Sequence, residues 1–483
     1  MDKMTRRRFL ERSLLSAAAL TGLGSLETVD AAGRPSRGRK VGPNEKIHVA
    51  CIGVHGRGLD HVRSYAARED AEVVAICDVD QSVIGRACKA VEEKNKPTPK
   101  AVQDLRHLLD DREVDAVSIA TPNHWHALAA IWAMQAGKDV YVEKPVSHNV
   151  SEGRRMVEAA RKYGRICQTG TQIRSMQGSR DAIEFIHSGQ IGRVTLARGL
   201  CYKPRASIGK YPDSPVPPGV DYDLWLGPAP VRPFNRNRFH YNWHWHWDYG
   251  NGDLGNQGIH QMDVARWALN KDTLPHSVLG LGGRFGYEDD GETPNTELTF
   301  YDYGDAHLIF EVRGLKTDPL KGAKIGNIIY GTDGYVVFSE YSVAVAFDNH
   351  DNAIRKFEGG GDHFGNFLDA VRSRRYMDLR ADILEGHLSS ALCHLGNISY
   401  RLGTLQPFNA KTKAFGDDKE AYETFGRFEQ HLADNGIALQ ETSYRLGPSL
   451  KFNPRAENFG HNAQANALLT RPYRAPFVVP ERV

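Results

Sequence analysis

The stretch NWHWHWDYGNGDLGNQGIHQMD, from Asn242 to Asp263, combines three histidines and three tryptophans with several acids and amides. His244 and His246 alternate with the tryptophans, so an extended strand would place both imidazoles on one face. Two such histidines could chelate a metal, but no His, Cys or carboxylate set at zinc spacing accompanies them. We therefore expect no metal, and instead a pocket in which aromatic faces cover C–H groups while imidazoles and amides bind hydroxyl groups. A packed aromatic strand is the alternative.

A helix is predicted at the end of this stretch, from Gly258 to Leu269. Its spacing places His260 and Asp263 on one face and apolar side chains on another, so one face can pack while the other stays available for chemistry. A histidine on the polar face could accept a proton from a bound hydroxyl group.

A glycine-rich turn, GVHGRG, follows the apolar run KIHVACI and precedes a helical pattern. The next apolar run ends at Asp78, about 20 residues further on, which is the spacing of dinucleotide-binding folds. Glycines let backbone amides approach a pyrophosphate, and the Asp78 carboxylate can accept hydrogen bonds from ribose hydroxyl groups. An acid there repels a 2′-phosphate, so we expect NAD rather than NADP. The expected contacts are Gly53, His55, Gly56, Arg57, Gly58 and Asp78.

Two further apolar runs end in the polar tripeptides TPN and EKP. The carboxyl ends of parallel strands meet at one edge of a sheet, where an α/β fold binds its ligand. We therefore expect additional cofactor contacts at Thr121, Asn123, His126, Glu143 and Lys144.

The elements that must position these residues follow from the alternation of apolar and amphipathic stretches. Residues 46–168 predict βαβ units, an α/β Rossmann domain with a doubly wound parallel sheet. Residues 169–408 predict an α+β substrate domain with an open, largely antiparallel sheet. Residues 409–483 are expected to form an irregular C-terminal extension.

The N-terminal residues carry a targeting pattern rather than a pattern of folded elements. The sequence TRRRFL precedes a short apolar run, a pattern that resembles a twin-arginine export signal. About 10 apolar residues are too few to span a bilayer. We therefore expect a signal peptide over residues 1–32, a basic linker over 33–45, and an exported, periplasmic protein without stable membrane insertion.

Charge and composition restrict the class of partner. Lys and Arg number 61 against 59 Asp and Glu, so the net charge of +2 gives no field that favours nucleic acid. With 41% hydrophobic residues the chain can bury real cores. We expect a small-molecule ligand and a homo-oligomer.

Taken in order, the glycine turn, the TPN segment with His126 and the EKP tripeptide resemble the Gfo/Idh/MocA oxidoreductases, named for glucose-fructose oxidoreductase, inositol dehydrogenase and a rhizopine catabolism protein. The resemblance extends from Lys46 to about Leu402 and implies that Lys144 lies at the reacting hydroxyl group. It also aligns residues 250–263 with a second family motif, in which the common catalytic aspartate is here Asn256. An amide cannot accept a proton as a carboxylate does, so His260 would act without that charge behind it.

The resemblance implies an NAD-dependent oxidoreductase that acts on a sugar, glycoside or cyclitol. In this scheme His260 takes the hydroxyl proton, Lys144 stabilises the developing alkoxide, and Asn256 replaces the usual aspartate. Lys203 and Arg205 could instead belong to a solvated basic loop. The expected substrate contacts are Lys144, Tyr202, Lys203, Arg205, His244, His246, Asn256 and His260.

Export makes soluble NAD scarce, so NAD would travel inside the folded protein and be regenerated there. Two chemistries satisfy this condition: transhydrogenation between two sugars, and glycoside cleavage by hydrolysis or elimination through a transient keto-sugar. The change to Asn256 also leaves open a noncatalytic carbohydrate-binding protein, and His244 with His246 a metal-dependent hydrolase or lyase.

Overall fold

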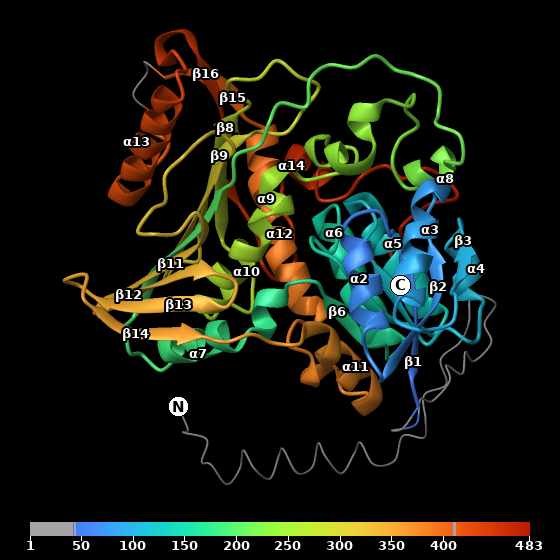
Figure 1. Cartoon of the computed structure of the whole chain (residues 1–483). Coiled ribbons are helices and arrows are strands. Elements are labelled where there is room, and N and C mark those ends of the chain that lie inside the picture. The colour runs from blue at the N-terminus through green and yellow to red at the C-terminus, as the bar shows by residue number, and fades with distance from the viewer. Residues whose placement is uncertain (1–41, 43–44, 409–411) are drawn as a thin grey trace.

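The computed structural model describes residues 42, 45–408 and 412–483, so the expected signal peptide and nearly all of the expected linker lie outside the described residues. A six-stranded sheet and an eleven-stranded sheet organise the chain (Figure 1). No helix within the described ranges is long and apolar enough to cross a membrane.

The first sheet is parallel, with strand order β3-β2-β1-β4-β5-β6. The order reverses between β1 and β4, which is where such sheets bind ligands. Short Val- and Ile-rich runs form these strands because both faces are covered and every side chain can be apolar. The strands are β1 (Ile47–Ile52), β2 (Ala71–Cys77), β3 (Lys100–Val102), β4 (Ala116–Ile119), β5 (Asp139–Val142) and β6 (Cys167–Thr169).

Helices cover both faces of this sheet, as the Rossmann prediction requires. One face carries α2 and α3, together with α11 from much later in the chain. The other carries α5 and α6, against which Phe477 of the C-terminal segment packs. The helices are α2 (Arg57–Ala66), α3 (Gln81–Glu92), α4 (Arg106–Leu109), α5 (Asn123–Gln135), α6 (Val150–Lys162) and α11 (His363–Ser373).

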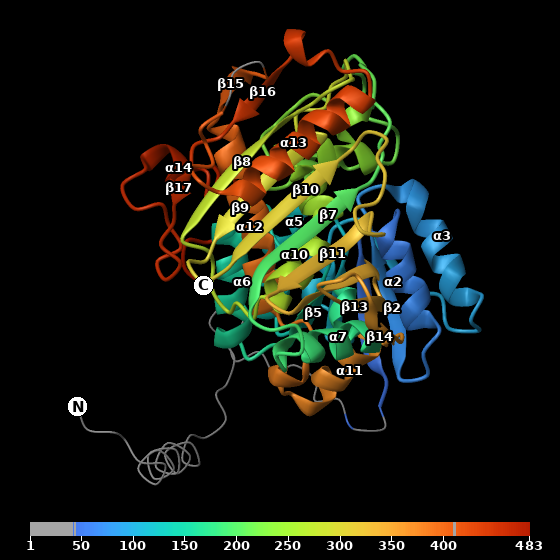
Figure 2. The same cartoon turned by 90° about the vertical axis from the view of Figure 1, so that its left-hand side faces the viewer.

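The second sheet has the order β14-β13-β12-β11-β7-β10-β9-β8-β16-β15, with β17 paired to β8, and only β7 and β10 run parallel. Helices α7, α10 and α12 pack on one face of this sheet (Figure 2). The strands are β7 (Val194–Tyr202), β8 (Ser277–Gly283), β9 (Thr296–Asp302), β10 (His307–Arg313), β11 (Ile325–Gly331), β12 (Gly334–Glu340), β13 (Val343–Asp348), β14 (Ala353–Glu358), β15 (Thr404–Pro407), β16 (Ser443–Leu446) and β17 (Leu450–Lys451).

Longer and shorter helices connect these strands. Both parts of the predicted fold class, the parallel Rossmann sheet and the largely antiparallel second sheet, are confirmed. The helices are α7 (Gln177–His187), α8 (Tyr222–Leu226), α9 (Gly252–Asn256), α10 (Gly258–Ala268), α12 (Ile383–Arg401), α13 (Lys419–Asp434) and α14 (Ala463–Ala467), with 3-10 turns η1 (Gln172–Ser175), η2 (Arg236–Arg238), η3 (His240–Trp245), η4 (Tyr376–Asp378) and η5 (Leu439–Glu441).

The segment after residue 408 is more regular than the sequence indicated. It contains α13, whose Phe425, Phe428 and Leu432 pack with Leu281 and Leu298 of the second sheet. It also supplies strands β16 and β17 at the edge of that sheet. The amphipathic pattern of α13 contains few apolar residues. The sequence pattern alone therefore does not show that this helix covers a face of the second sheet.

The strand expected around His244 and His246 is wrong, because His244 lies within the 3-10 turn η3 and His246 directly follows it. His240 has a φ of +48°, which breaks an extended run, and the amide of His246 donates to the Trp243 carbonyl at 3.2 Å. The ring of Trp243 stacks on that of His244 at 3.5 Å between centroids. The two histidines therefore do not share a strand face.

A buried ion pair ties α10 to the start of the second domain. Asp263 accepts hydrogen bonds from Nε and Nη2 of Arg174 at 2.7 and 2.9 Å, and from Oγ of Ser389 at 2.7 Å. The Asp263 side chain is 1% exposed and that of Arg174 is 7% exposed. Removing one partner leaves the other charge buried with less compensation.

We predict that Asp263→Ala lowers the free energy of unfolding by about 3 kcal/mol, because it removes one half of a buried pair. Glu358→Ala is the matched control, since Glu358 pairs with Lys356 while both side chains are more than half exposed. The control should change the stability by less than about 1 kcal/mol. Urea unfolding measures both, and equal losses in the two variants would contradict the prediction.

Candidate functional site

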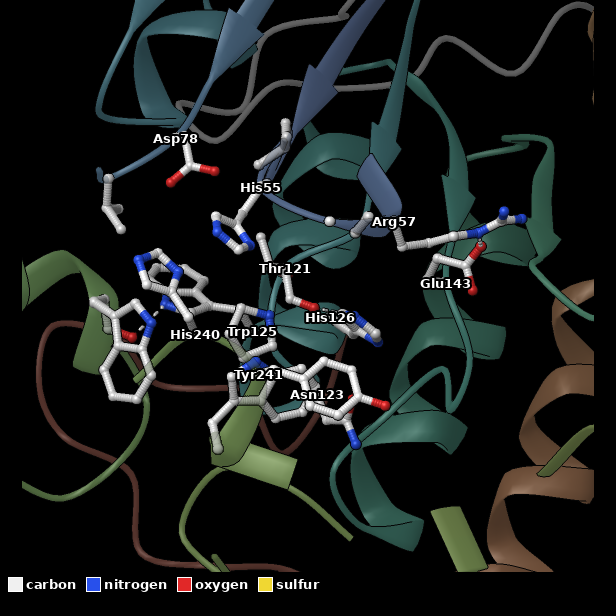
Figure 3. Close-up of a pocket in the computed structure, with 18 of the residues that line it drawn as sticks. His55, Arg57, Asp78, Thr121, Asn123, Trp125, His126, Glu143, His240 and Tyr241 are labelled. Carbon is white, nitrogen blue, oxygen red and sulfur yellow. Dashed lines mark hydrogen bonds and ion pairs between the residues drawn. The ribbon is translucent and has the colours of Figure 1, made fainter. Parts of the chain in front are cut away.

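A cavity of about 470 Å³ lies at the carboxyl ends of the first sheet, beside the reversal of strand order (Figure 3). Its walls come from both domains. The Rossmann domain contributes Gly53, His55, Gly56, Arg57, Asp78, Thr121, Asn123, His126, Glu143 and Lys144. The second domain contributes Lys203, Tyr241, His244, Asn256, Gln257 and several aromatic side chains. Every predicted cofactor contact except Gly58 thus lines one cavity.

Two glycines of the turn are required by close backbone packing. A Cβ at Gly58 would lie 1.7 Å from the Gly53 carbonyl oxygen, and a Cβ at Gly53, whose φ is +79°, would lie 2.8 Å from the Thr121 amide nitrogen. Gly56 instead faces open space, with nothing within 4 Å of a Cβ position. The turn therefore leaves room at the start of α2, which fits the pyrophosphate of NAD.

Asp78 directly follows β2 and lies beside the glycine turn. Its carboxylate accepts hydrogen bonds from the amides of Val54 at 2.7 Å and Asp80 at 3.0 Å. A carboxylate can accept about four hydrogen bonds, so capacity remains for ribose hydroxyl groups. Burial raises the pKa of Asp78 to about 6, against the lowering effect of the amides. Charged Asp78 therefore predominates above that pH.

A pair of histidines joins the glycine turn to the second domain. The rings of His55 and His240 stack with centroids 4.2 Å apart (Figure 3). Nε2 of His240 also lies 3.0 Å from Oδ2 of Asp80. The sequence reading missed His240. Its signal is only its adjacency to the Trp- and His-rich stretch, because the contact joins residues that are distant in sequence.

Glu143 supports the cavity wall as an ionised, buried carboxylate. It accepts hydrogen bonds from Nε of Arg57 at 2.9 Å and from Nε2 of Gln172 at 3.1 Å, and Nε2 of His61 lies 3.0 Å from it. Burial alone would raise its pKa, but Arg57, His61 and Lys144 outweigh burial and hold the pKa well below its usual range. Glu143 thus places a negative charge beside Lys144.

His126 and Asn123 hold the strand ends in place. The ring nitrogens of His126 lie 2.6 Å from the Pro145 carbonyl oxygen and 2.7 Å from that of Thr121, so His126 joins the EKP and TPN segments. Nδ2 of Asn123 donates to Oδ1 of Asn251 at 2.9 Å. Both residues lie at the cavity, and both have structural bonds of their own.

Lys144 reaches from the end of β5 to the second half of the chain. Its ammonium group donates a hydrogen bond to the carbonyl oxygen of Asn256 at 2.9 Å. Burial lowers the pKa of Lys144, and the positive charges of Arg57 and Lys203 add to this effect while Glu143 opposes it. A lysine with a lowered pKa can exchange a proton more readily near neutral pH.

Asn256 lies among polar groups of the second domain. Its Nδ2 donates to the Tyr241 hydroxyl oxygen at 3.3 Å and lies 3.5 Å from Oδ1 of Asp253. Asp253 forms a two-pronged ion pair with Arg205 at 2.9 and 2.7 Å, and Arg205 also donates to the Tyr241 hydroxyl at 2.9 Å. With its amide nitrogen engaged, Asn256 has its side-chain oxygen left to accept a bond in the cavity.

His260 is not among the residues that line this cavity, although Lys144 and Glu143 of the cavity act electrostatically on it. It is 5% exposed, packs against the Tyr341 ring at 5.0 Å, and its Nδ1 has no hydrogen-bond partner in the described part of the chain. Burial lowers its pKa well below the usual value, and the Lys144 charge lowers it further. A histidine that resists protonation is a poor proton acceptor. Asp263 is held by Arg174 and cannot support it.

The other predicted substrate contacts separate into two groups. Lys203 and His244 line the cavity, and burial lowers the pKa of His244 to about 3, so its imidazole is neutral. His246 instead points to the Asn237 carbonyl oxygen, 2.8 Å from its Nε2. Tyr202, the last residue of β7, is buried, and its hydroxyl donates to Glu311. Neither His246 nor Tyr202 is among the cavity residues, and Arg205 acts through Asp253 and Tyr241.

Tyr241 and Gln257 are cavity residues that the sequence reading did not single out. Both neighbour residues that it did select, yet no periodicity marks them, because η3 and the junction of α9 with α10 are too short to show one. In the described ranges no group of three His, Cys, Asp or Glu side chains is arranged to hold a metal ion.

Several known proteins are similar to this chain. "Glycosyl hydrolase family 109 protein 2" of Shewanella sp. (strain ANA-3) is 33% identical over 205 residues, 40% of this chain and 45% of that protein. The "Glycosyl hydrolase family 109 protein" of Shewanella pealeana is 30% identical over 203 residues, 40% of this chain and 44% of that protein. The chain thus spans less than half the length of these curated relatives.

Solved structures share the fold. The WlbA dehydrogenase from Bordetella pertussis, in complex with NADH and UDP-GlcNAcA, is 22% identical with a TM-score of 0.53 and covers 72% of this chain and 94% of its own. UDP-N-acetylglucosamine 3-dehydrogenase GnnA from Acidithiobacillus ferrooxidans is 18% identical with a TM-score of 0.52 and covers 73% of this chain and 97% of its own.

Two family models account for most of the chain. Residues 47–171 match the "Oxidoreductase family, NAD-binding Rossmann fold", and residues 194–432 match the "Oxidoreductase family, C-terminal alpha/beta domain". The first matched segment contains all six strands of the first sheet, the second contains strands β7 to β15 of the second sheet, and residues of both segments line the cavity. The resemblance drawn from the glycine turn and the TPN and EKP segments is thereby confirmed. The chain belongs to the Gfo/Idh/MocA family of oxidoreductases and carries an NAD-binding Rossmann domain.

Proposed function

We propose that this protein oxidises a hydroxyl group of a sugar, glycoside or cyclitol, and that the oxidation is reversed within each catalytic cycle. The observation that carries the proposal is the position of Lys144, whose ammonium lies in the cavity where the NAD-binding edge of the first sheet meets Asn256 of the second domain. Names of relatives that denote glycosyl hydrolases and sugar-nucleotide dehydrogenases support a carbohydrate substrate.

NAD, when bound, supplies the acceptor for the hydride that leaves the hydroxyl-bearing carbon. Gly53, Gly56 and Asp78 form the cradle that would hold it. Lys144 binds the reacting hydroxyl oxygen, takes its proton when the amine is neutral, and returns that proton in the reverse step. Tyr241 and the Asn256 side-chain oxygen bind neighbouring hydroxyl groups.

This assignment places proton transfer on Lys144 rather than on His260. Lys144 lines the cavity, whereas His260 is not among the cavity residues and has a pKa well below the usual value. The imidazole of His260 is then neutral and adds no positive charge near Lys144. Loss of the family's usual aspartate at position 256 is compatible with this arrangement, because Lys144 binds the backbone carbonyl of that residue and not its side chain.

The closed redox cycle and export are linked proposals. The arginine-rich start of the chain supports export, and an exported enzyme needs NAD that stays bound and is regenerated in place. Glycoside cleavage through a transient keto-sugar fits this need, and the family 109 names of the curated relatives favour it over transhydrogenation. In the C-terminal segment, Arg474 donates to the Gly227 carbonyl and pairs with Asp223 of α8. Residues 471–477 thereby contact the outer side of the segment that forms part of the cavity wall.

Lys144→Met should lower the single-turnover rate of NAD reduction by sugar by at least about 100-fold, the usual range for losing a positioned proton-transfer group. The effect should fall on turnover more than on substrate binding. Lys210→Met is the control, because Lys210 is 63% exposed and pairs only with exposed Glu288. Stopped-flow absorbance of NADH gives the rate. A wild-type rate in Lys144→Met would refute the assignment.

The closed cycle predicts many turnovers of a glycoside per bound NAD without added nucleotide. Native mass spectrometry of protein purified without nucleotide should show NAD. In deuterium oxide, product should carry deuterium at the carbon beside the oxidised one if elimination occurs, whereas transhydrogenation needs a second sugar and leaves that carbon unlabelled. Release of NADH in proportion to product, with activity that stops until NAD is added, would contradict the cycle.

The raised pKa of Asp78 predicts how NAD affinity depends on pH. The charged carboxylate accepts ribose hydroxyl groups, so NAD should bind tightly above pH about 6 and more weakly as pH falls through that value. Asp78→Asn should weaken NAD binding at neutral pH and flatten this dependence. Asp305→Asn is the control, since Asp305 is 69% exposed, pairs with Lys271 and is not a cavity residue. Calorimetric titration measures the affinities, and an equal pH dependence in Asp78→Asn would count against the role of this carboxylate.

A further inference from the structure

Two lysines in the cavity have no acidic partner. Nζ of Lys203 donates to Oε1 of Gln257 at 3.0 Å, and Nζ of Lys144 donates to the Asn256 carbonyl. Within the described residues no carboxylate oxygen lies within 4.0 Å of either nitrogen. An ammonium has three N–H donors, so each lysine has donors left for a ligand.

The acidic side chains nearby are already paired. Asp253 is held by both arms of Arg205 at 2.9 and 2.7 Å. Glu143 is held by Arg57 at 2.9 Å and lies 3.0 Å from His61. Neither carboxylate can turn to Lys203 without breaking its own buried pair, which is costly. Among the described residues, Lys144 and Lys203 therefore have no carboxylate of their own, because Glu143 and Asp253 are each paired with an arginine.

Gln257 fixes the position of Lys203. Its Nε2 donates to the Tyr341 hydroxyl oxygen at 3.0 Å and lies 3.4 Å from Oε1 of Gln261, which orients its Oε1 toward Lys203. A lysine anchored in this way loses less conformational freedom when it binds a ligand. A solvated basic loop would not provide such an anchor, so the placement favours a binding role for Lys203.

We infer that the substrate is a sugar that carries a carboxylate group, which Lys203 binds as an ion pair while Lys144 faces the reacting hydroxyl. This inference rests on the proposed oxidation of a sugar hydroxyl. A carboxylate brings one negative charge, which matches the single ammonium of Lys203. A phosphate monoester brings a charge of about −1.5 to −2 and would call for further donors. The pyrophosphate of NAD is met by the glycine turn and not by Lys203.

The test compares acidic sugars with their neutral counterparts, using glucuronate against glucose, galacturonate against galactose, and glucose 6-phosphate as the phosphate probe. Reduction of bound NAD gives kcat/KM, and calorimetry on the purified protein gives affinity without turnover. At least one acidic sugar should exceed its neutral counterpart by about tenfold or more, the usual effect of one hydrogen bond to a charged group.

Variants then assign the preference to Lys203. Lys203→Met should abolish the preference by raising KM for the acidic sugar, whereas Lys203→Arg should keep most of the preference. Gln257→Leu removes the anchor but keeps the charge, so a preference that survives there excludes a merely structural effect of Lys203→Met. Lys210→Met, outside the cavity, should behave as the wild type.

The outcomes separate the two claims. Equal kcat/KM for acidic and neutral sugars, or a preference that persists in Lys203→Met, overturns the carboxylate inference and leaves the proposed oxidation intact. A preference for glucose 6-phosphate over glucuronate overturns it in favour of a phosphate group. No reduction of NAD and no binding with any of these sugars counts against the proposed function itself.

Discussion

The hydrogen bond from the Lys144 ammonium to the Asn256 carbonyl oxygen is the contact on which the site depends. Asn256 is the last residue of α9, and carbonyl groups at the end of a helix lack partners within it. They also carry partial negative charge, which suits a cation. One strand end of the Rossmann sheet and one helix end of the second domain thus meet at a single polar contact, and the cavity forms around it.

Charge pairing explains why this lysine stays available. The two carboxylates closest to the chemistry, Glu143 and Asp253, are each occupied by an arginine, so they shape the local field without neutralising Lys144. The cofactor end is different, because Asp78 is held only by backbone amides and keeps capacity for hydroxyl groups. The cavity is therefore acidic where a ribose would bind and basic where a substrate would bind.

Much of the first domain could be predicted because its signals are local. Strand runs, glycine turn and Asp78 lie within about 30 consecutive residues, as the βαβ unit requires. Gly58 shows the limit even there: its role is to let the chain pass the Gly53 carbonyl, not to touch a ligand. The second domain was harder to read. His246 and Tyr202 have suitable chemistry, yet one faces Asn237 and the other Glu311.

The sequence by itself determined the parallel sheet, the NAD-binding edge and the position of Lys144 at the end of a strand, because apolar periodicity, glycines and strand-end polar residues act over short distances along the chain. Only the tertiary structure decided that His260 is not a cavity residue, that His240 stacks on His55, and that Lys203 donates to Gln257 rather than to a carboxylate of the described residues. Which way a side chain faces, and which charges neutralise one another, depends on contacts between segments far apart in sequence. A 3-10 turn in place of a strand was enough to separate His244 from His246.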